Sequence, residues 1–152
     1  MEASKITIRQ PRPGELEAVR DLRYQVLDKD KGLPRKTSSD TDEVASSVHM
    51  AAFYGNRVVS TVRLNPLVDD PHVYLVRRMA TDVEYRGEGI GSRVLRAAEA
   101  EAINRGAESF VLHAREKAAT FYARAGYEPT GEHVVHDGDV NITMTKRAVH
   151  GT

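Results

Sequence analysis

Three glycines occur within five positions, at Gly87, Gly89 and Gly91, directly after Arg86 and just before a helical pattern. N–H groups at the start of a helix lack intrahelical partners and lie at the positive end of the helix dipole, so they bind anions. Glycines lack a Cβ, which lets a phosphate or pyrophosphate approach the main chain, and Arg86 would add a full charge beside it. A strand-to-helix turn that needs glycine for its tightness alone is the other interpretation.

Two familiar phosphate-binding loops do not match this stretch. The dinucleotide-binding fingerprint is G-x-G-x-x-G, whereas the sequence here is G-x-G-x-G, and no Lys-Ser or Lys-Thr pair follows, as a Walker loop requires. The six histidines show no H-x-x-x-H or similar spacing, so the sequence predicts no metal site.

The composition excludes several classes of function. Lys plus Arg and Asp plus Glu both number 22 in 152 residues, so bulk charge favours neither nucleic acid nor an anionic membrane. There are no cysteines, which removes disulfides, thiolate metal sites and a cysteine nucleophile. The polar start and the lack of a 20-residue apolar run predict neither a signal peptide nor a membrane span. We therefore expect a cytoplasmic protein with no nucleic-acid or membrane partner.

The elements that would position these residues follow from apolar periodicity. Alternating or apolar runs predict strands, the runs flanking Gly55-Asn56 and Asp137-Gly138 predict hairpins, and steps of three and four predict helices. The strands are expected near 5–10, 48–54, 57–68, 73–81, 109–114, 127–136 and 139–146, and the helices near 14–28, 89–105 and 116–125, with a polar loop over 29–47. This order predicts an α/β fold: a mixed, mostly antiparallel sheet of about seven strands with one parallel βαβ crossover and flanking helices. We expect one domain over 1–147 and a tail over 148–152.

Two segments carry a resemblance to a known family. Residues 86–91, RGEGIG, match the R/Q-x-x-G-x-G/A pyrophosphate loop of the GNAT superfamily of acyl-CoA-dependent N-acyltransferases. Residues 118–127, AATFYARAGY, resemble its A-x-x-F-Y-x-x-x-G-F segment, with Tyr127 in place of the usual Phe. The order of elements is also similar to that of the family. The sequence of these segments looks closest to that of its small ElaA-like members. The resemblance implies acetyl-CoA as co-substrate and a primary amine of a small molecule, peptide or protein as acceptor, attacked directly.

The resemblance also implies the site residues. Backbone N–H groups of Met79 and Ala80 would hold the pantetheine arm and polarise the thioester carbonyl, where a preorganised donor is worth about 2.7–4 kcal/mol. Tyr122 would protonate the departing thiolate as a general acid, although its helical position is equally that of a core aromatic. The residues expected to bind the coenzyme are Met79, Ala80, Arg86, Gly87, Glu88, Gly89, Ile90, Gly91, Ser92 and Arg115.

The residue that accepts the amine proton is less clearly marked, because the strand at 73–81 carries no carboxylate. His113 is favoured because strand ends beside a parallel crossover face the ligand crevice. His49, Asp82, Glu84 and a solvent relay are the alternatives. Arg115 stands where relatives often have an asparagine; it would reach a coenzyme phosphate or simply begin a solvated helix.

Two other functions stay open on the sequence alone. A module that binds acyl-CoA without transferring the acyl group would keep the same loop, and an unrelated phosphate-binding domain would need only the glycines. We expect the 29–47 loop and the terminal hairpin to select the acceptor amine, whose identity the sequence does not indicate. A monomer or a homodimer is expected.

Overall fold

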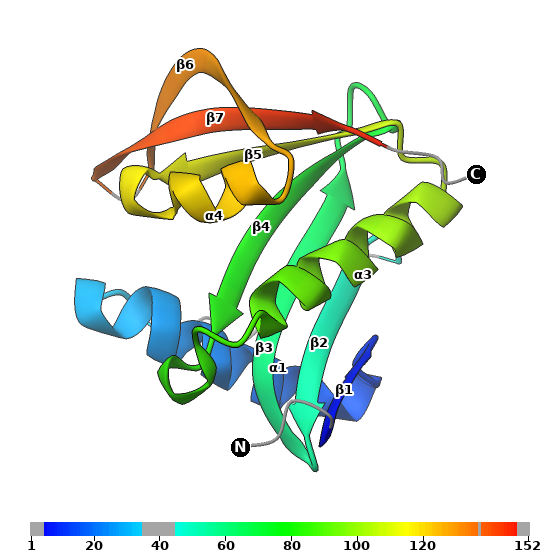
Figure 1. The fold of residues 1–152 in the computed structure, drawn as a ribbon, viewed down its shortest axis with the longest axis vertical. Coiled ribbons are helices and arrows are strands. Elements are labelled where there is room, and N and C mark those ends of the chain that lie inside the picture. Colours follow the sequence, from blue (N-terminus) through cyan, green and yellow to red (C-terminus); the bar gives the residue numbers. More distant parts are fainter. Residues whose placement is uncertain (1–4, 35–44, 137, 149–152) are drawn as a thin grey trace.

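A computed structural model describes residues 5–34, 45–136 and 138–148. One twisted sheet runs through the molecule, with α3 and α4 on one face and α1 on the other (Figure 1). The strands are β1 (Ile6–Arg9), β2 (Val48–Tyr54), β3 (Arg57–Pro66), β4 (Val73–Thr81), β5 (Ser109–Arg115), β6 (Glu128–His136) and β7 (Asp139–Arg147). The helices are α1 (Leu16–Arg23), α3 (Ile90–Asn104) and α4 (Ala119–Arg124). The predicted seven-stranded mixed α/β fold is confirmed.

The sheet has the order β1-β2-β3-β4-β5-β7-β6. Its described strands pair antiparallel except for β4 and β5, which are parallel and joined through α3. This is the predicted crossover. Both predicted hairpins form, β2 with β3 across Gly55-Asn56 and β6 with β7; Asp137 in the second turn lies outside the described residues.

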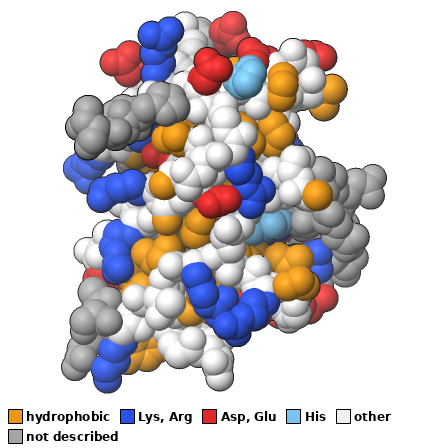
Figure 2. All heavy atoms as spheres, turned by 90° about the vertical axis from the view of Figure 1, so that its right-hand side faces the viewer, with side chains coloured by type: hydrophobic (Ala, Val, Ile, Leu, Met, Phe, Trp, Pro, Cys, Tyr) orange, Lys and Arg blue, Asp and Glu red, His pale blue; other side chains and the backbone are white. Residues whose placement is uncertain are grey.

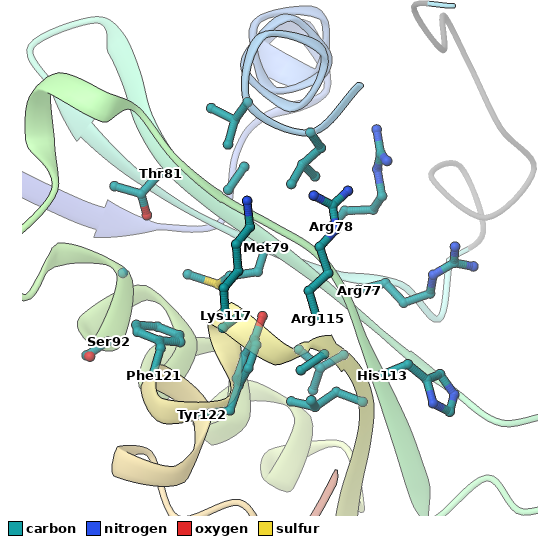
Figure 3. A pocket seen from close by; sticks show the side chains of 18 of the residues that line it. Arg77, Arg78, Met79, Thr81, Ser92, His113, Arg115, Lys117, Phe121 and Tyr122 are labelled. Carbon is teal, nitrogen blue, oxygen red and sulfur yellow. The ribbon is translucent and has the colours of Figure 1, made fainter. Parts of the chain in front are cut away.

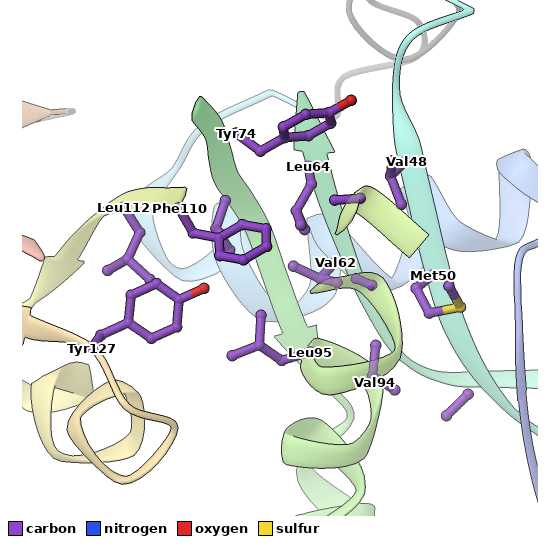
Figure 4. Close-up of a cluster of buried hydrophobic side chains, with 14 of the residues drawn as sticks. Val48, Met50, Val62, Leu64, Tyr74, Val94, Leu95, Phe110, Leu112 and Tyr127 are labelled. Carbon is purple, nitrogen blue, oxygen red and sulfur yellow. The ribbon is translucent and has the colours of Figure 1, made fainter. Parts of the chain in front are cut away.

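The core that fixes this arrangement lies mainly between the sheet and α3. Ile90, Val94, Leu95, Ala98 and Ala102 form the buried face of α3, as their spacing predicts. Figure 4 shows Val94 and Leu95 packing near side chains of β2, β3 and β4, with Phe110, Leu112 and Tyr127 beside them. A smaller cluster under α1 joins Val19 and Leu22 to Phe53 and Val58 on the opposite face.

The segment predicted as one helix over 14–28 consists of three pieces. A 3-10 turn (Pro13–Glu15) precedes α1, and a π-helical turn (Tyr24–Asp28) continues it. A π-turn adds a residue to the helical repeat and is frequent at functional sites. Another 3-10 turn (Lys29–Lys31) follows, and residues 35–44 of the predicted 29–47 loop lie outside the described residues.

The surface agrees with the balanced composition. On the face drawn in Figure 2, acidic side chains lie mainly at the upper end and basic ones over the middle and lower part, and neither sign covers the whole face. In the described part of the chain, no helix combines the length and apolarity that crossing a membrane requires. Nor do three His, Asp or Glu side chains of these residues gather as a metal site would need.

Candidate active site

The parallel pair β4–β5 is joined over only part of its length. Val73, Tyr74 and Leu75 pair with Ser109, Phe110 and Val111, and the described ladder goes no further. Beyond this point β4 also bulges against β3: Arg77 and Ala80 pair with β3, and the register shifts between them. Arg78, which lies within the bulge, has a left-handed φ of 57°. The strands therefore separate, and the pocket at the opening has a volume of about 880 Å³.

The glycine loop forms one end of this pocket. Gly87 and Gly89 adopt φ angles of 85° and 77°, which L-residues with side chains rarely tolerate. Gly89 is the N-cap of α3 and no side chain caps this end, so the first N–H groups of the helix remain available to a ligand. The Arg86 Nε donates to the Thr81 carbonyl oxygen at 3.2 Å, which holds this exposed guanidinium beside the loop.

Gly91 has a different role from the other two glycines. It lies in the first turn of α3 and is buried, and a Cβ there would come within 3.1 Å of the Thr81 Oγ1 and 3.3 Å of the Met79 Cε. The absence of a side chain lets α3 approach β4 closely, so the pocket floor depends on this contact.

Tyr122 lies at the middle of the pocket, between its two ends (Figure 3). Its ring packs edge-on against Phe121 at 5.0 Å and against Tyr127 at 6.0 Å between centroids. Burial raises the pKa of the Tyr122 phenol to about 12, because a phenolate would lose its hydration there. The hydroxyl therefore stays protonated at neutral pH, as a proton donor must.

Tyr127, although adjacent, belongs to the core. Its hydroxyl donates to the Glu99 Oε2 at 2.7 Å, and the Lys146 Nζ donates to the Glu99 Oε1 at 2.8 Å. Burial, and then the Glu99 carboxylate, raise the pKa of the Tyr127 phenol. The Tyr127 hydroxyl, which a phenylalanine would lack, therefore belongs to a hydrogen-bond network with Glu99 and Lys146.

Among the four candidate bases, His113 is the one that lines the pocket. Its Nδ1 lies 3.0 Å from the Thr143 Oγ1 on β7, which orients the ring. His49 is buried on β2, which lies two strands from β4 in the sheet, and its Nδ1 is 3.3 Å from a terminal nitrogen of Arg23. Asp82 accepts from Arg57 at 2.8 Å, and Glu84 is exposed near the same arginine; neither residue is part of the pocket lining.

The other predicted site residues also take defined places. Met79, Ala80, Arg86, Gly87, Gly89, Ile90, Gly91, Ser92 and Arg115 line the pocket, whereas Glu88 is exposed and does not. Met79 and Ala80 lie on the part of β4 beyond its pairing with β5, where their backbone borders the opening. Arg115 lies near Asp139, with its Nε 3.7 Å from the Oδ2.

The sequence analysis missed one wall of the pocket. The π-helical turn after α1 contributes Val26, Leu27 and Asp28, and β4 contributes Arg77 and Arg78. Asp28 is buried and accepts both terminal nitrogens of Arg78, at 3.2 and 2.8 Å. The consecutive arginines were a usable signal, because two charges in a row interrupt the alternation of a strand and indicate a bulge.

The chain resembles known acetyltransferases in sequence and in fold. Residues 15–127 match the family model described as Acetyltransferase (GNAT) family. A Bacillus subtilis (strain 168) protein named "Putative acetyltransferase BSU40680" is 28% identical over 149 residues, 97% of each chain. The crystal structure of Escherichia coli ElaA superposes with a TM-score of 0.79 at 19% identity, covering 93% of this chain and 98% of that one. An aminoglycoside 6'-N-acetyltransferase crystallised with coenzyme A gives 0.79 at 16%, covering 96% and 99%.

Proposed function

This chain belongs to the acetyltransferase (GNAT) family, and on that premise we propose that it moves an acetyl group from acetyl-CoA to a primary amine by direct attack. The observation that carries the proposal is a partly buried phenol, Tyr122, in a split between β4 and β5 that opens beside a helix N-terminus without a side-chain cap. One structural neighbour is an acetyltransferase complexed with coenzyme A, which supports the choice of donor.

The glycine loop and Arg86 would hold the pyrophosphate of the coenzyme. The first N–H groups of α3 would donate to the pyrophosphate, and the exposed Arg86 guanidinium would add a positive charge beside it. From this point the pantetheine arm would run along Met79 and Ala80 toward Tyr122. Glu88 lies outside the pocket lining, so we propose that its backbone, rather than its carboxylate, takes part.

The chain would assist the reaction in three ways: it stabilises charge on the carbonyl oxygen, protonates the departing thiolate and accepts a proton from the amine. The amine lone pair attacks the thioester carbon, and the negative charge that builds on the carbonyl oxygen is stabilised by N–H groups of Met79 and Ala80. As the C–S bond breaks, the thiolate takes the Tyr122 proton, and solvent then reprotonates the phenolate. Desolvation raises the pKa of Tyr122, and the same environment would raise the pKa of a bound coenzyme thiol, so proton transfer from the phenol to the thiolate would stay feasible.

The amine must lose a proton before or during attack. We propose His113 as the acceptor of that proton, directly or through water, because it is the one candidate base in the described pocket lining. The contact between its Nδ1 and the Thr143 Oγ1 fixes the orientation of the ring. Water accepting the proton without His113 is the alternative, and a His113→Gln variant with unchanged turnover would favour it.

A screen tests the proposal. The protein is incubated with acetyl-CoA and a panel of polyamines, amino acids, aminoglycosides and peptides, and thiol release is followed. Acceleration by at least one amine supports transfer. Coenzyme binding with slow hydrolysis that no amine accelerates would instead identify a binding module, and a melting temperature that acetyl-CoA leaves unchanged would reject the coenzyme site. At a hundredfold excess over its Kd, bound coenzyme stabilises a fold by about 2.7 kcal/mol.

A further inference from the structure

We propose that the acceptor amine carries an anionic group, a carboxylate or a phosphate, which binds to guanidinium groups at the end of the pocket opposite the glycine loop. The proposal rests on the proposed function and names the substrate class of the same site. Its basis is the juxtaposition of Arg77, Arg78 and Arg115 around the opening between β4 and β5.

The three arginines reach one side of the pocket from two strands. Leu112 and Ala114 face the core cluster on the α3 side, so the alternation of β5 turns His113 and Arg115 to the α1 side. On β4, Arg78 reaches the same side, because its guanidinium meets Asp28 at the end of the π-helical turn. The bulge with its left-handed Arg78 lets two successive arginines border the opening.

This end is separate from the expected coenzyme site. Figure 3 shows Arg77, Arg78, Arg115 and His113 on one side of Tyr122, and Thr81, Ser92 and Phe121 on the other. The pyrophosphate is expected on the second side, where the loop and Arg86 lie. Charges on the first side therefore face the route by which the acceptor would reach the thioester.

The charge of the lining is strongly one-sided. Among the described residues it contains six cationic side chains, Arg77, Arg78, Arg86, Arg115, Lys117 and Arg124, and one carboxylate, Asp28. Asp28 and Arg78 neutralise each other through two hydrogen bonds, so the other five cationic side chains carry the excess charge of the lining. Asp139, near Arg115, is outside the lining and also pairs with Lys31, which lowers the pKa of its carboxyl.

Such a wall disfavours a polyamine and favours an amine with an acid group. A second ammonium would meet like charges at short range in a partly desolvated pocket, where repulsion is screened little. A carboxylate or phosphate would accept hydrogen bonds from planar guanidinium groups, often two from one arginine. The acid group would also orient the amine toward the thioester.

Matched acceptor pairs test this. Each pair differs in the acid group alone: 4-aminobutyrate against 4-aminobutanamide, and phosphoethanolamine against ethanolamine, with rates expressed per unprotonated amine. Loss of one charge-assisted hydrogen bond corresponds to about ten- to hundredfold. We expect the anionic member of at least one pair to have a kcat/KM at least about tenfold higher. The pair that shows the preference distinguishes carboxylate from phosphate.

Variants locate the effect. Arg115→Gln should reduce the preference for the anionic member about tenfold. The Kd for coenzyme A is measured alongside, because the sequence analysis expected Arg115 to bind the coenzyme. Arg96→Gln, on the exposed side of α3, removes the same charge away from the pocket and should change neither value. If Arg115→Gln weakens coenzyme binding and keeps the preference, Arg115 serves the coenzyme and the proposal is wrong.

A readout without turnover separates this proposal from the proposed function. The protein saturated with coenzyme A is titrated with each pair, and its melting temperature is followed. Stabilisation by the anionic members, lost in Arg115→Gln, supports the anion site even if no amine is acetylated. Equal or greater stabilisation by the neutral members would overturn the proposal, whether or not transfer occurs.

Discussion

Asp28 and Arg78 form a buried, two-point ion pair that joins the end of the π-helical turn to the bulge of β4. The Asp28 side chain is 2% exposed and that of Arg78 13%, and the shorter N–O distance is 2.8 Å. Arg78 has a positive φ, an unfavourable backbone conformation that the pair helps to hold. Met79, the next residue, is expected to present its N–H to the thioester, so the pair supports the geometry of the site.

Breaking this pair should destabilise the protein strongly. Asp28→Asn leaves a buried guanidinium without its counter-charge, and such losses cost about 3–5 kcal/mol. Chemical denaturation followed by circular dichroism measures the change. The double variant Asp28→Asn/Arg78→Gln should lose less than the sum of the two single variants, because it leaves no unpaired charge. Additive losses would show that the two side chains act independently.

Tyr122 and Tyr127 offer a matched pair for assigning the general acid. Tyr122→Phe removes the hydroxyl that faces the pocket, so kcat should fall about 10²–10⁴-fold, with coenzyme affinity and melting temperature almost unchanged. Tyr127→Phe removes a hydroxyl bonded to buried Glu99 and should cost about 1–3 kcal/mol of stability, with kcat nearly unchanged. Full turnover of Tyr122→Phe would return Tyr122 to a packing role.

The raised pKa of Tyr122 predicts the alkaline part of the pH profile. The pKa in the folded protein is about 12, above the ordinary value of 10, so the neutral phenol persists as pH rises past 10. kcat/KM should therefore rise from pH 6 to 10 as the amine deprotonates, with no fall caused by the acid. A descending limb near pH 9 that disappears in Tyr122→Phe would contradict this. Because the unfolded chain ionises this phenol near pH 10 and the folded chain only near pH 12, the free energy of unfolding should fall between these two values.

Gly89 and Gly106 allow the loop to be tested at equal strain. Both have left-handed φ angles, 77° and 105°, at opposite ends of α3, and an added Cβ would meet nothing within 4 Å at either position. Alanine should cost about 1–2 kcal/mol at each. Only Gly89→Ala should also weaken coenzyme binding, because strain there moves the N–H groups proposed to hold the pyrophosphate. Equal affinity in the two variants, measured by calorimetry, would reject this role for the loop.

Much of the fold could be predicted because local signals agreed with tertiary packing. The apolar spacing of α3 predicted its buried face, and the glycine hairpin at 55–56 and the strand at 73–81 were located correctly. The polar residues of the site were harder. The sequence favoured His113 over His49, Asp82 and Glu84 only because it lies near the end of a strand. The tertiary structure is what places His113 in the pocket lining.

Contacts between segments far apart in the sequence were not predicted. Asp28 and Arg78 are 50 residues apart, and a helical pattern over 14–28 does not show that its last residue turns toward a strand. The split between β4 and β5 is likewise invisible in either strand alone, because it arises where pairing stops. The sequence therefore indicated the glycine loop, which is local, far better than the part of the pocket lined by Asp28, Arg78 and Arg115, which three separate elements build.

Mass analysis of the amine product tests the central claim most directly, because thiol release also follows simple hydrolysis. Acetyl-CoA carrying an isotopically labelled acetyl group is incubated with the protein and the best amine of the screen. We expect labelled acetyl on the amine nitrogen in an amount equal to the thiol released, and almost none with Tyr122→Phe over the same time. Thiol release accompanied by free labelled acetate and an unmodified amine would contradict acetyl transfer.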